Sequence, residues 1–233
     1  MSSRVRHGTA VVPTPAPEAS PRIGTVADLL HELGDVPPER VLWNPIPGTA
    51  TEADVVRHVD GDDKRLVELI DGTLVEKAIG AYEDRVGAIL LYRIEQFLES
   101  NDLGITFGPS ATLPILPRQV RLPDVSFVSW SKLPDRQLPA EAIAGVVPDL
   151  AVEILSRSNR PRELARNRRD YFAAGVRLVW QIDPETRAVE AFTGPDECIA
   201  IPPDGDLDGG DVLPGFRLPL AQLFERAGKR SGG

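Results

Sequence analysis

Two carboxylates stand in otherwise apolar, strand-like stretches of the sequence. Asp124 follows Pro123 and precedes Val-Ser-Phe-Val, while Glu153 lies inside the run Leu-Ala-Val-Glu-Ile-Leu. Successive side chains of a strand point to opposite faces, so Glu153 projects from the face opposite to Val152 and Ile154. An unpaired charge in a buried strand is costly, and such a group is usually paired or bound to a metal. Two acids converging from neighbouring strands would make a hard-oxygen site suited to Mg²⁺.

Each acid also has an ordinary structural explanation. Pro-Asp often opens a strand, with the carboxylate satisfied by a nearby amide. Glu153 is harder to explain in this way, because charged residues are almost never fully buried unless they are paired. Glu83, near the start of a predicted helix, could reach the same site, but a solvated helix charge is the better interpretation of that residue.

The elements that must position these acids follow from the apolar pattern. Residues 65–77 read as a β-hairpin around the turn Asp71-Gly72. Apolar residues at helical spacing predict an amphipathic helix over 82–100, and residues 105–116 suggest a strand pair with a bend at Pro109. A second core helix is expected over 162–174, with Pro161 in its first turn and Gly175 as its C-terminal cap. A strand over 176–183, an antiparallel return over 188–193 and a last helix over 220–226 complete the pattern.

The N-terminal quarter differs in composition from the rest. Residues 1–22 are rich in Pro, Ser, Thr and Ala, which predicts a disordered tail. Thr25 with Asp28, and Thr51 with Asp54, resemble capping boxes that start two short helices. We therefore expect a small helical accessory element over 23–60 and one main domain over 61–228.

Bulk properties exclude some classes of protein and leave others open. The chain has 233 residues, 42% of them hydrophobic, and a formal net charge of −9. This charge argues against a nonspecific nucleic-acid coat, although a nuclease with an acidic metal site and local basic residues is compatible with it. Cys198 is the single cysteine, and no apolar run approaches the ~20 residues needed to span a bilayer. A cytoplasmic protein without a membrane partner is expected.

Several short motifs, weak one by one, resemble a known family in their order and spacing. They resemble the Uma-type group of bacterial endonuclease-like proteins, in the PD-(D/E)XK or restriction-endonuclease-like superfamily, over roughly residues 24–226. The motifs that carry the resemblance are Pro-Asp (123–124), Glu-Ile-Leu (153–155), Tyr-Phe-Ala-Ala-Gly (171–175) and Val-Trp-Gln-Ile-Asp (179–183), together with an upstream stretch from Glu68 to Lys77 and a downstream stretch from Leu207 to Phe224.

The resemblance implies a fold, an activity and a set of site residues. The fold would be α/β, with a mixed sheet flanked by the two long helices. Asp124, Glu153 and the main-chain carbonyl of Ile154 would hold Mg²⁺ or Mn²⁺ for the hydrolysis of DNA phosphodiester bonds. Glu68 would complete the acidic cluster; its alternative is a partly exposed hairpin residue.

The chain departs from the family at the catalytic lysine. The superfamily places a lysine two residues after the glutamate, where this chain has Leu155, and the Uma-type group places it on the following helix, at the position of Asn167. Asn167 can orient a water or a phosphate oxygen, but it cannot supply a cation to the transition state. The alternative function is therefore a catalytically impaired nuclease fold that binds nucleic acid or another partner.

Six arginines lie between residues 157 and 169, the only basic concentration in an acidic chain. We expect Arg162, Arg166 and Arg168 to contact a DNA backbone, while a solvated helix face is the competing interpretation. DNA is thus the expected partner, and a homodimer is left open.

Overall fold

The computed structural model describes residues 24–61, 65–78, 80–138 and 140–228, so the predicted disordered tail over 1–22 lies outside the described residues. The helices are α1 (Val26–Glu32), α2 (Glu52–Asp60), α3 (Ala81–Leu98), α4 (Pro161–Ala174) and α5 (Leu220–Ala227), with short 3₁₀ helices at Pro38–Arg40, Trp130–Lys132 and Pro134–Arg136. None of the helices in these ranges is long and apolar enough to cross a membrane.

The larger sheet has six strands in the order β10-β9-β8-β7-β6-β3. Its strands are β3 (Gly104–Phe107), β6 (Val125–Ser129), β7 (Leu150–Ile154), β8 (Leu178–Asp183), β9 (Ala188–Phe192) and β10 (Cys198–Ile201). Only β7 and β8 pair in parallel, and α4 makes the crossover between them. A parallel neighbour requires such a crossover, which explains why the helix stands between these two strands in the sequence.

A second, four-stranded antiparallel sheet has the order β2-β1-β5-β4. Its strands are β1 (Val67–Ile70), β2 (Thr73–Glu76), β4 (Leu113–Leu116) and β5 (Gln119–Arg121). The predicted hairpin is confirmed, with positive φ at both Asp71 and Gly72, as a tight two-residue turn requires. A small two-stranded sheet, β11 (Asp206–Asp208) and β12 (Arg217–Pro219), precedes α5.

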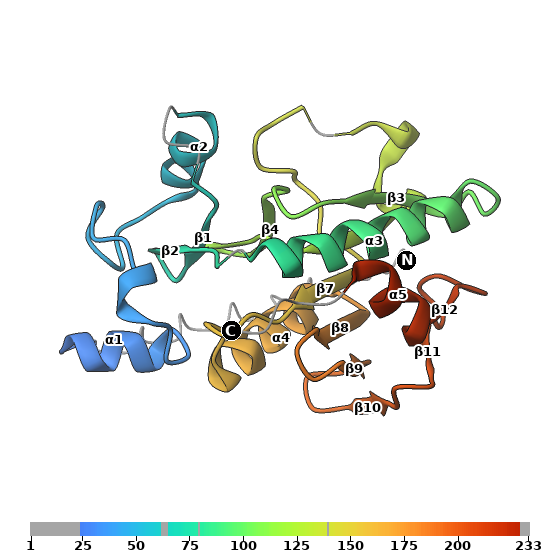
Figure 1. The fold of residues 1–233 in the computed structure, drawn as a ribbon. Coiled ribbons are helices and arrows are strands. Elements are labelled where there is room, and N and C mark those ends of the chain that lie inside the picture. Colours follow the sequence, from blue (N-terminus) through green and yellow to red (C-terminus); the bar gives the residue numbers. More distant parts are fainter. Residues whose placement is uncertain (1–23, 62–64, 79, 139, 229–233) are drawn as a thin grey trace, which may run out of the picture.

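The helices cover the sheets in two groups (Figure 1). The apolar face of α3 and the C-terminal helix α5 share one core with β6, β7 and β8, in which Trp180 is fully buried. On the other side, α1 and α2 pack through Leu29, Leu33 and Val55 against the four-stranded sheet. Both N-terminal helices begin with the capping boxes expected from the sequence. The division into an accessory element and a main domain stays a prediction.

The α/β fold with a mixed sheet between helices agrees with expectation, but two details were wrong. The structure has separate six- and four-stranded sheets in place of a single small one. Strands β3 and β4 were expected to pair with each other, yet β3 pairs with β6 and β4 pairs with β5. The chain turns at residues 109–110 between them, which lets the two strands join different sheets.

Candidate active site

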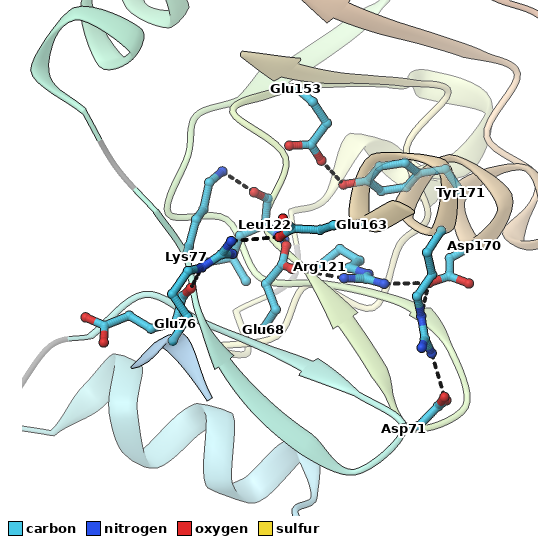
Figure 2. A network of polar contacts seen from close by, with 12 residues as sticks. Glu68, Asp71, Glu76, Lys77, Arg121, Leu122, Glu153, Glu163, Asp170 and Tyr171 are labelled. Atoms are coloured by element: carbon cyan, nitrogen blue, oxygen red, sulfur yellow. Dashed lines mark hydrogen bonds and ion pairs between the residues drawn. The ribbon is translucent and has the colours of Figure 1, made fainter. Parts of the chain in front are cut away.

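The predicted site residues come together where the two sheets and α4 meet. Figure 2 shows Glu68 and Glu153 of this group, with Lys77 and Tyr171 near them. Glu68 comes from β1, Asp124 directly precedes β6, Glu153 is in β7 and Asn167 is in α4. All four line one cavity of about 20 Å³, roughly the space of a single water. The remaining lining residues are Arg40, Lys77, Ala78, Ile154, Asn159 and Glu163.

Asp124 is fixed by the strand that carries Glu153. Its backbone N–H donates to the carbonyl of Val152 at 2.9 Å, and its Oδ2 accepts from the Ile154 N–H at 2.6 Å. The ordinary role suggested by the Pro-Asp pattern, a carboxylate that accepts from a nearby amide, is therefore present. It occupies only one oxygen, because Oδ1 lies 2.8 Å from the ammonium of Lys77.

Glu153 is an acid of the site whose pKa is strongly raised. Its side chain is buried, and Oε1 accepts a hydrogen bond from the hydroxyl of Tyr171 at 2.6 Å. Burial raises the pKa of Glu153 to about 8, and the neighbouring charges of Asp124 and Glu68 add to this effect against the opposing charge of Lys77. Such a carboxyl is a candidate functional group, since strong perturbation by burial and by specific neighbours is typical of active sites.

Lys77 is a residue of the site to which the sequence pattern assigned no role. It directly follows β2, and its ammonium contacts both Asp124 and the carbonyl of Leu122. Burial disfavours the charged form, but the carboxylates of Asp124, Glu153 and Glu68 outweigh this cost and raise the pKa of Lys77. A cation therefore lies next to the acids. This holds although Leu155 occupies the superfamily's lysine position and Asn167 that of the Uma-type group. The available signal was the Glu-Lys pair at the end of the predicted hairpin.

Glu68 is buried, so the alternative of a partly exposed hairpin residue was wrong. Its Oε2 pairs with Arg121 at 3.0 Å, and its Oε1 accepts from the Leu122 N–H at 3.0 Å. Arg121 is fully buried and also pairs with Asp170 of α4 at 2.5 Å. Burial opposes the charge of Arg121, yet Glu68 and Asp170 raise the pKa of the guanidinium above its ordinary value. Glu68 thus lines the cavity, while both of its carboxylate oxygens accept hydrogen bonds within this buried network.

Asn167 lines the cavity from the side of α4. Its side chain is buried, and Glu163, one turn earlier on α4, lines the same cavity. Glu163 pairs with Arg40 at 2.9 Å, which connects α4 to the segment between α1 and α2.

The predicted DNA-contacting arginines do not form one surface. Arg162 and Arg166 line a groove of about 450 Å³ beside α1, together with Arg169. There Arg162 contacts His31 and Asp35, and Arg166 contacts Asp71 and the carbonyl of Glu32. Arg168 does not line this groove, and the Cζ of its guanidinium lies 4.1 Å from the centre of the Phe192 ring. Their role in DNA binding stays a prediction.

A second, larger cleft adjoins the acidic site. It has a volume of about 210 Å³ and shares Ala78, Asp124 and Ile154 with the small cavity. Glu83 lines this cleft and is buried, so the interpretation of this residue as a solvated helix charge was wrong.

Comparison with known proteins bears on the fold and on the family of the chain. A crystal structure described as "a putative nuclease belonging to DUF820", from Anabaena variabilis ATCC 29413, superposes with a TM-score of 0.60. It is 20% identical in sequence, and the alignment covers 69% of this chain and 90% of that chain, a likeness that shows the fold. No curated protein matches the chain. Residues 54–221, well over half of the sequence, match the family model Uma2, described as "Putative restriction endonuclease". The chain therefore belongs to the Uma2 family, as its motifs suggested.

Proposed function

We propose that this protein hydrolyses DNA phosphodiester bonds in a metal-dependent, endonuclease-like reaction. The observation that carries the proposal is the ammonium of Lys77, 2.8 Å from Asp124 and beside Glu153 in the same cavity. The loss of the family lysine at Asn167 was the main argument against catalysis. Lys77 answers it, because a cation held among the acids can stabilise charge that develops on a phosphate in the transition state.

The donor set suits a metal that keeps part of its water shell. Among the described residues there is no cluster of three or more His, Cys, Asp or Glu side chains able to enclose an ion. Mg²⁺ seldom needs one, since it commonly binds through one or two carboxylates together with waters and substrate phosphate. Asp124, Glu153 and the carbonyl of Ile154 would hold Mg²⁺ or Mn²⁺, which when bound supplies Lewis-acid polarisation of the phosphate and an acidified water.

The chain's own groups then have distinct roles. Asp124 is oriented by the Ile154 N–H, which leaves Oδ1 directed to the cavity side with Lys77. Tyr171 donates a hydrogen bond to Oε1 of Glu153, which leaves Oε2 as the oxygen that would bind the metal. Asn167 offers an amide that can position the attacking water or a phosphate oxygen from α4.

One observation favours the alternative, a nuclease fold that binds without cutting. Lys77 already compensates the charge of Asp124, so the site is electrostatically satisfied without a metal. In that case Lys77 would be a structural counter-ion, and Asn167 would mark the loss of the catalytic cation.

Mg²⁺-dependent nicking of supercoiled plasmid separates the two functions. We expect wild-type protein to nick, Asp124→Asn to be inactive, and Lys77→Gln to lose about 10²–10³ in rate, as for removal of one preorganised electrostatic donor. Lys132→Gln is the matched control, because Lys132 also pairs with a buried aspartate, Asp149, at 3.1 Å, and neither residue lines the cavity. It should cut as fast as the wild type.

Asn167→Lys tests the position where the family carries its cation. If Lys77 has taken over that role, a lysine at 167 should leave the nicking rate nearly unchanged. A large gain in rate from Asn167→Lys, combined with no loss from Lys77→Gln, would instead identify the natural protein as an impaired nuclease.

A further inference from the structure

The larger cleft beside the acidic site is suited to a ligand group other than the scissile phosphate. It is lined by the N-terminal half of α3 and by Asp124 and Ile154. It adjoins the small cavity, because Ala78, Asp124 and Ile154 line both. Whatever occupies it would therefore be attached to, or lie directly against, the phosphate positioned at Asp124.

Small residues keep this cleft open. Ala78, Gly80, Gly87 and Ala88 all line it. Gly87 is in the middle of α3, where glycine is unfavourable, and a Cβ there would approach Cδ1 of Ile154 to 3.2 Å. At Gly80 a Cβ would meet the carboxylate of Glu83, which would have to move aside. The cleft bordered by these small residues has a volume of about 210 Å³.

The lining of the cleft excludes some ligands by charge and size. Glu83, Asp84 and Asp124 are all acidic, and a second phosphate placed among them would be repelled. Leu91 and Pro109 supply apolar walls. The volume is below the roughly 300–1,000 Å³ of pockets for drug-sized ligands, so a single ring system is the appropriate occupant.

We propose that this cleft receives one unpaired nucleobase adjacent to the scissile phosphate, which makes DNA with an unpaired nucleotide at the cut site the preferred substrate. A planar base would pack against Leu91 and Pro109, while its amino groups would donate to the acidic rim. A base inside an intact duplex is stacked and paired, and must be extruded at a cost before it can enter a recessed cleft. The inference rests on the proposed nuclease function for the position of the phosphate.

The test compares three oligonucleotides of one sequence: intact duplex, duplex with a single bulged nucleotide, and single strand. Wild-type protein should cut the last two about tenfold faster or more, since a base in the intact duplex must first be unstacked and unpaired, and the other two substrates avoid that cost. Ala88→Phe, at an exposed position in the wall, should abolish this preference by filling the cleft. Gln96→Phe, equally exposed on α3 but outside the cleft, is the control and should retain it.

A binding measurement separates this inference from the proposed hydrolysis. With Ca²⁺ in place of Mg²⁺, 2-aminopurine at the bulged position should change its fluorescence with wild type and Gln96→Phe, but not with Ala88→Phe. Such a signal without any cleavage would support the cleft and overturn the hydrolysis. Equal cutting of all three substrates, or a fluorescence change that survives Ala88→Phe, would overturn the cleft.

Discussion

At the scale of residues, the site is a small set of charges that depend on one another. Asp124 and Glu153 lie in one cavity with Lys77, and each acid is held by a neutral donor, the Ile154 N–H for one and the Tyr171 hydroxyl for the other. Burial disfavours the ionised form of Glu153 and raises its pKa to about 8. The surrounding carboxylates raise the pKa of Lys77, although burial acts in the opposite direction. The free energy of unfolding should therefore depend on whether Glu153 is protonated.

The raised pKa of Glu153 predicts a loss of stability with increasing pH. In the unfolded chain this carboxyl would titrate near its ordinary value of 4.5, and in the folded protein at about 8. Between those values the folded state binds the proton and the unfolded state does not. The free energy of unfolding should therefore fall as pH rises from about 4.5 to about 8, by no more than about 1.4 kcal/mol per pH unit.

Urea denaturation across this pH range, with divalent ions chelated, measures the effect. Glu153→Gln is the informative variant, because it cannot ionise and should flatten the profile. A wild-type profile as flat as that of Glu153→Gln would mean that Glu153 is ionised in the folded protein throughout the range.

The residues that could be found from sequence are those embedded in a local pattern. Asp124 and Glu153 interrupt apolar strands, and Asn167 has a defined helical spacing from Tyr171. Lys77 has no such relation to Glu153, since it reaches the site only because the hairpin sheet folds against the mixed sheet. Spacing along one strand or helix cannot reveal a cation that arrives from another sheet.

At the scale of elements, Arg121 connects the four-stranded sheet to α4 through its ion pairs. It lies in β5 and pairs with Glu68 of β1 and with Asp170 of α4. Its side chain has no exposed surface, and it compensates the charge of both acids, with Arg166 as a more distant second partner of Asp170 at 3.8 Å. It also fixes α4, the helix that presents Asn167 and Tyr171, against the four-stranded sheet.

Replacing Arg121 should destabilise the protein far more than replacing an exposed arginine. Arg121→Met leaves Glu68 and Asp170 without their shared partner, and we expect a loss of about 3–5 kcal/mol in the free energy of unfolding. The control is Arg217→Met, whose exposed pair with Asp208 should contribute less than about 1 kcal/mol. Chemical denaturation gives both values, and similar small losses for the two variants would contradict the linking role.

The elements themselves were predictable to different degrees. Helices α3 and α4 and the β1–β2 hairpin have strong local signals, in the form of apolar periodicity, a Gly175 cap and an Asp-Gly turn. The division into two sheets had no such signal. Strands β3 and β4 are close in sequence, but their partners, β6 and β5, are chosen by packing over longer distances.

At the scale of the whole molecule, the charge distribution limits how DNA can be bound. The chain carries a formal net charge of −9, and two of the four arginines of α4, Arg162 and Arg166, are paired with acids. Within the described part of the chain, the groove beside α1 gathers three of the four, namely Arg162, Arg166 and Arg169. Phosphate contacts should therefore be few and confined to this groove and to the acidic site.

The salt dependence of binding tests this limit directly. Each neutralised phosphate contributes about −0.9 to the slope of log K against log salt, so about three contacts predict a slope near −3 for a duplex. Arg162→Gln combined with Arg169→Gln should bring the slope closer to zero by about two, since both side chains are exposed at the groove. Arg217→Gln, which removes a similarly exposed arginine from another part of the surface, should leave it unchanged. Fluorescence anisotropy over a series of salt concentrations gives the three slopes. A double variant with the wild-type slope would place the phosphate contacts outside the groove.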